Sequence, residues 1–73
     1  PETVIPFGLP EEGHVRVSVY DVLGRLVTTL VDGVLSAGRH EVVFRADRLP
    51  TGVYLIRMEV SREVRTQRVT LMK

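Results

Sequence analysis

The stretch His14–Tyr20 reads HVRVSVY and alternates apolar and polar side chains without interruption. Alternation with a period of two is typical of a β-strand that buries one face, because successive side chains point to opposite sides of a sheet. The valines of this stretch are therefore expected to point into a core. The residues between them, Ser18 among them, are expected on a solvent face.

The same alternation recurs on both sides of this stretch, between short polar turns. The expected strands cover residues 5–9, 14–20, 25–31, 40–45, 53–60 and 64–72. The expected turns lie at residues 10–13, 21–24, 32–33, 36–38, 47–52 and 61–63. Six or seven short strands at this spacing indicate an all-β sandwich, mainly antiparallel.

The positions of the strands follow from their composition. Pro6 lacks an amide proton, so the first strand is expected at a sheet edge. Residues 53–60 are the most apolar stretch and are expected at the centre of a sheet. In the final strand, Val69 and Leu71 are expected to face inward. The predicted core comprises Val17, Val19, Val42, Phe44, Tyr54, Ile56 and Val69.

Residues 22–31 also fit a helical pattern, because Val22, Leu26 and Leu30 are spaced four apart. Gly24 would cost a helix interior about 1 kcal/mol. The β-branched residues at 27–29 suit a pleated surface better than a helix. We therefore predict a strand.

Length and composition favour one domain over residues 1–73 without covalent or metal support. A chain of 73 residues is too short for two cores. It has no cysteine and a net charge of +1. The basic end of the chain lacks the aromatic residues that stack on bases, which argues against nucleic-acid binding. No apolar run approaches the ~18 residues of a membrane span, so membrane insertion is not expected.

The inventory of reactive side chains is thin, and we predict no enzyme, no cofactor and no metal site. Ser18 would need a histidine and an aspartate beside it to act as a nucleophile. His14 and His40 each begin an alternating strand and would meet only if those strands were neighbours. Asp21, Asp32 and Asp47 are expected in turns, where such side chains bond nearby amides.

Three motifs occur in a fixed order along the chain: VYDVLGR at residues 19–25, LSAGRHEV at 35–42 and LPTGVY at 49–54, followed by Arg57. Together they resemble the C-terminal sorting domains of the type IX (Por) secretion system, over nearly the whole chain. A related immunoglobulin-like domain occurs in the flagellar hook-capping protein. Two features depart from the family pattern: the Asn-Pro-rich entry motif is absent, and the paired basic residues of the last strand are replaced by Gln67-Arg68.

The resemblance implies an immunoglobulin-like sandwich that ends a longer secreted protein. It implies a signal that directs this protein through the periplasm of a Gram-negative bacterium to the surface or the medium. The implied partners are an outer-membrane translocon and a sortase-like peptidase that removes the domain and attaches the cargo to the surface. The alternatives are a hook-cap-like scaffold and an adhesive, carbohydrate-binding sandwich. The absence of tryptophan disfavours sugar binding.

Candidate recognition residues are Arg68 and Lys73, which are expected to project to solvent from the last strand, and the motif residues Gly52, Tyr54 and Arg57. Some of these residues also have structural interpretations. Gly24, Gly38 and Gly52 are expected to adopt positive φ in turns. Tyr54 is expected to fill the core beside Phe44, and Arg57 is either solvated or paired. Exposed edge strands predict self-association of the isolated domain, limited by Pro6.

Overall fold

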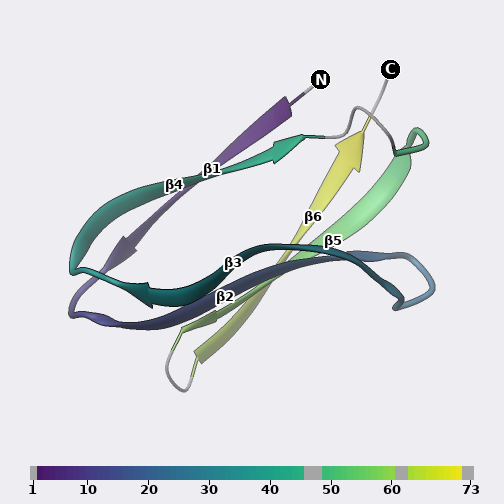
Figure 1. Ribbon diagram of the computed structural model, residues 1–73. Coiled ribbons are helices and arrows are strands. Elements are labelled where there is room, and N and C mark those ends of the chain that lie inside the picture. Colours follow the sequence, from purple (N-terminus) through teal and green to yellow (C-terminus); the bar gives the residue numbers. More distant parts are fainter. Residues whose placement is uncertain (1, 46–48, 61–62, 72–73) are drawn as a thin grey trace.

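The computed structural model describes residues 2–45, 49–60 and 63–71, and these residues form six β-strands in two sheets (Figure 1). The larger sheet has the order β3-β2-β5-β6, the smaller sheet pairs β1 with β4, and every pair is antiparallel. The predicted all-β sandwich is confirmed. The strands are β1 (Glu2–Leu9), β2 (Gly13–Asp21), β3 (Leu26–Leu35), β4 (Gly38–Arg45), β5 (Gly52–Val60) and β6 (Glu63–Leu71).

The core lies between the two sheets, where their alternating apolar side chains meet. Val15, Val17 and Val19 of β2 are completely buried, as is Phe44 of β4. The remaining buried apolar residues are Ile5, Leu9, Val42, Tyr54, Ile56 and Leu71. The predicted core is therefore confirmed except for Val69, which is partly buried and packs against this cluster. The buried residue of β6, among those described, is Leu71 instead.

The rings of Phe44 and Tyr54 meet edge to face across the two sheets. Their centroids are 6.2 Å apart and their planes are inclined by 73°. This geometry places the positive edge of one ring against the negative face of the other. The predicted packing of Tyr54 beside Phe44 is confirmed.

The prediction of a strand after the turn at residues 21–24 is confirmed, but the predicted end of this strand was wrong. β3 continues through Asp32 and Gly33, which were expected to form a turn. Asp32 lies on the outer face of the sheet, opposite Arg16 and 2.9 Å from the His14 side chain, so its charge needs no turn to reach solvent. The other expected turn aspartate, Asp47, lies outside the described residues, as do parts of the turns at 47–52 and 61–63.

The prediction that Ser18 lies on a solvent face was also wrong. Its side chain faces outward in register with Thr29 of β3 and Arg57 of β5, yet the residue is only 3% exposed. The small Ser18 side chain lies on a central strand between Thr29 and the much longer Arg57 side chain, and little of it reaches solvent. Burial therefore removes Ser18 from consideration as an accessible nucleophile.

The smaller sheet covers only part of the larger one. On β6 only Val69 and Leu71 are shielded, whereas residues 63–68 are exposed. A groove of about 720 Å³ opens between the edge of β1 and strands β5 and β6, and Phe7, Met58 and Gln67 are among its lining residues. β1 and β6 are edge strands, as expected for β1.

Candidate recognition surface

The register places two of the candidate recognition residues together on the outer face of the larger sheet. Arg57 lies opposite Ser18 on β2 and Thr66 on β6, and Arg68 lies opposite Leu55 of β5. The two arginines thus occupy adjacent strands on the same face, two residues out of line. Both are exposed. Arg68 projects to solvent as predicted, whereas Lys73 lies outside the described residues.

A row of four side chains crosses the outer face at this level. The register aligns Tyr20 with Leu26 on one side and with Leu55 on the other, and Leu55 with Arg68. We call Leu26, Tyr20, Leu55 and Arg68 the outer row. Leu26 is 53% exposed, while Tyr20 and Leu55 are half-buried. The outer row therefore combines apolar surface with one cationic end.

Arg57 is both solvated and paired, so the two structural interpretations of this residue hold together. Its Nε atom lies 3.1 Å from a carboxylate oxygen of Glu59, two residues along the same strand and on the same face. Almost half of the Arg57 side chain remains exposed. Exposed pairs of this kind contribute little to stability. The guanidinium is thus held on the outer face but stays accessible.

Tyr54 and Gly52 lie at the start of β5, and of the two only Tyr54 has a clear structural role. The Tyr54 ring lies in the core, and its hydroxyl donates a hydrogen bond of 2.7 Å to the carbonyl oxygen of Pro50. Gly52 does not adopt positive φ, unlike Gly24 and Gly38, so that prediction was wrong for Gly52 alone. A Cβ atom added to Gly52 would meet nothing within 4 Å. The fold of the described residues does not require glycine there.

The turn between β2 and β3 is built by three residues of the first motif. One oxygen of the Asp21 carboxylate accepts hydrogen bonds of 2.9 Å from the amides of Leu23 and Arg25, and the other accepts one of 2.8 Å from the Arg25 side chain. The Asp21 carbonyl accepts a further bond from the Gly24 amide. Gly24 has φ 83°, which only glycine adopts without strain.

A family model described as "Secretion system C-terminal sorting domain" matches residues 3–72. The chain belongs to this family. No curated protein and no solved structure matches it. The chain is thus a C-terminal signal of type IX secretion, which directs export to the cell surface or the medium of a Gram-negative bacterium.

The sorting domain does not bring its two histidines together. His14 lies beside Asp32 on the larger sheet, whereas His40 stacks on Phe7 of the smaller sheet with ring centroids 5.5 Å apart. Among the described residues no three potential metal ligands cluster. Within the same residues no helix has the length and apolarity needed to cross a membrane.

The exposed pair Val22 and Leu23 in the sorting domain's first turn was missed by the sequence reasoning. Their exposed fractions are 67% and 74%. The signal was available, because two large apolar residues inside a polar turn have no core to reach from there. The sequence placed them in the expected turn at residues 21–24 and in the first motif, and their alternative helical spacing was noted, but their exposure was not predicted.

We expect Asp21 to titrate below its ordinary range. The pKa of Asp21 is lowered mainly by the hydrogen bond from the Arg25 amide, with further contributions from the Arg25 side chain and the Leu23 amide. A carboxyl with a lowered pKa stabilises the fold above its ordinary pKa, and this contribution is lost as pH falls through the lowered value. Carboxyl NMR titration is the measurement. Arg25→Gln is expected to raise the Asp21 pKa only partly, since the backbone bonds remain; an Asp21 pKa at or above the ordinary value would contradict the bonding described.

Proposed function

We propose that the type IX translocon binds the outer face of the larger sheet, with Arg57 and Arg68 as its polar contacts. The observation that carries this proposal is the register, which sets the two arginines on adjacent strands of one exposed face, two residues out of line. Charged side chains on a solvated face contribute little to folding. Their positions are therefore free to serve recognition.

Two further candidate residues take different roles in this proposal. Gly52 has ordinary φ and open space around it, so its lack of a side chain suits close approach of a partner to the backbone. Tyr54 supports that segment from within, through its ring in the core and its bond to Pro50. A sortase-like peptidase then removes the domain and attaches the cargo to the surface. The domain is a substrate in these steps and catalyses none of them.

The test fuses residues 1–73 to a periplasm-directed fluorescent reporter in a host that has a type IX system. We expect Arg68→Ala to leave the reporter in the periplasm, while Arg65→Ala is exported. The control is closely matched: Arg65 lies on the same strand, loses the same charge, and has an 82% exposed side chain on the opposite face of the sheet. The free energy of unfolding, measured by thermal denaturation, is expected to be the same for both variants within about 0.5 kcal/mol.

Two more variants extend the same experiment. Combining Arg68→Ala with Lys73→Ala tests the second basic residue of the last strand. Gly52→Ala is expected to preserve stability, because alanine fits there and restricts the unfolded chain, yet to reduce export. Normal export of Arg68→Ala, alone and combined with Lys73→Ala, would place recognition away from this face.

A further inference from the structure

The turn between β2 and β3 carries two neighbouring exposed apolar side chains, one of which, Leu23, is the most exposed large apolar side chain among the described residues. Val22 and Leu23 are 67% and 74% exposed, and Leu26, which follows the turn, is 53% exposed. Burying such side chains is favourable by about 25 cal/mol for each Å² removed from water. Apolar residues gathered at one exposed place, beside polar ones, mark sites of protein contact.

Val22 and Leu23 are exposed on a turn that hydrogen bonds hold in one conformation. The Asp21 carboxylate accepts hydrogen bonds from the amides on both sides of Gly24 and from the Arg25 side chain. The Asp21 amide donates to the Arg25 carbonyl oxygen, which closes the loop at its base. Asp21, Gly24 and Arg25 thus build the turn. The Leu23 amide takes part in these bonds, whereas the side chains of Val22 and Leu23 take no part in them and are exposed. The first motif therefore contains two sets of residues. Asp21, Gly24 and Arg25 form the turn, and Val22 and Leu23 are an exposed apolar pair within it.

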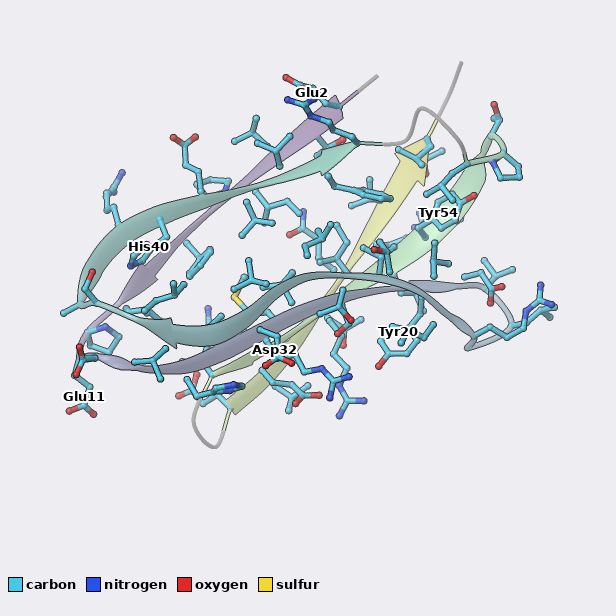
Figure 2. The ribbon with its side chains drawn as sticks, in the orientation of Figure 1. Glu2, Glu11, Tyr20, Asp32, His40 and Tyr54 are labelled. Atoms are coloured by element: carbon cyan, nitrogen blue, oxygen red, sulfur yellow. The ribbon has the colours of Figure 1, made fainter. Side chains whose placement is uncertain are left out.

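The outer row begins just after the turn in sequence. Leu26 follows the turn directly and lies in register with Tyr20, which in turn lies in register with Leu55. Figure 2 shows Tyr20 on the side of the larger sheet that faces away from the smaller one. An apolar strip thus runs from Leu26, beside the turn in sequence, across three strands and ends at Arg68 on the fourth.

We propose that Val22 and Leu23 are an apolar anchor that inserts into a hydrophobic pocket of a type IX machinery protein. Such a pocket would carry an acidic side chain where the strip ends at Arg68. A rigid, protruding apolar pair fits a concave partner, and interface energy concentrates in central anchors of this kind, ringed by polar contacts. The inference rests on the proposed function and names the partner surface that recognises the domain.

The test measures binding of residues 1–73 to the purified outer-membrane translocon by fluorescence anisotropy, together with export of the reporter fusion. We expect Val22→Ser plus Leu23→Ser to weaken binding at least about tenfold, the effect of losing an interface anchor, and to block export. Val34→Ser is the matched control, since Val34 is also 67% exposed but lies at the opposite end of β3. It is expected to bind and to be exported normally.

A second variant separates contact from damage to the turn. Val22→Ile plus Leu23→Met keeps apolar surface and is expected to retain binding, while amide NMR signals of Leu23 and Arg25 report whether the turn is intact. Unchanged binding and export of the serine variant would overturn the anchor and leave the proposed function standing. Equal losses in the serine variant and the Val34→Ser control would also overturn it. If the intact segment neither binds nor is exported, both proposals are wrong.

Discussion

Replacing Phe44 by alanine is expected to lower the free energy of unfolding by about 3–5 kcal/mol. Phe44 is the largest completely buried side chain among the described residues. It joins the smaller sheet to the larger one through its edge-to-face contact with Tyr54. Its removal leaves a cavity that two sheets held apart by many other side chains cannot fill. A domain with a total stability of about 5–15 kcal/mol would lose much of it.

Chemical denaturation followed by circular dichroism measures this loss. Val43→Ala is the control, because Val43 precedes Phe44 on β4, faces the other way and is 41% exposed. We expect that control to change stability by no more than about 0.5 kcal/mol. An unchanged midpoint for Phe44→Ala, or a dominant helical spectrum for the intact domain, would refute the sandwich.

Replacing Leu71 by alanine is expected to cost about 2–5 kcal/mol. Leu71 is 3% exposed and lies in register with Gly52, so it closes the core at the end of β6. No other residue of β6 is fully buried among those described. Packing at this end of the core, between β5 and the smaller sheet, therefore depends on the Leu71 side chain.

Val64→Ala on the same strand provides the comparison. Val64 is 53% exposed on the outer face, and we expect its loss to change stability by less than about 0.5 kcal/mol. Urea titrations of the two variants decide the matter. Equal midpoints would mean that β6 is not anchored through Leu71.

Much of the fold could be predicted because the alternating pattern is local. Val17 and Val19 face inward with completely buried side chains, and Phe44 meets Tyr54, as their spacing indicated. The course of β3 could not be predicted in this way. Its pairing with β2 shifts register between Val17 and Ser18 and again between Val19 and Tyr20. Such irregularities depend on the neighbouring strand. Asp32-Gly33 is a turn signal in sequence, but both residues pair in register with Arg16 and Val15 of β2, which the local sequence does not show.

The candidate surface was less predictable than the core. That Arg68 points to solvent followed from alternation, but its alignment with Leu55 and Tyr20 depends on pairing between strands far apart in sequence. Gly52 was assigned to a positive-φ turn because most motif glycines serve one, and its ordinary φ became visible only in three dimensions. Self-association through the edges of β1 and β6 stays a prediction. Light scattering that shows a strict monomer up to millimolar concentration would contradict it.

The outer row also determines when, during synthesis and folding, a partner could bind it. Its four members come from β3, β2, β5 and β6, so residues 20 and 68 must both be synthesised and paired before the row exists. Pairing between distant strands is slow compared with the formation of local contacts. A ribosome that stops early, or a chain still collapsing, presents no such row. A partner that binds the outer row would therefore bind only molecules in which this domain has been fully synthesised and folded.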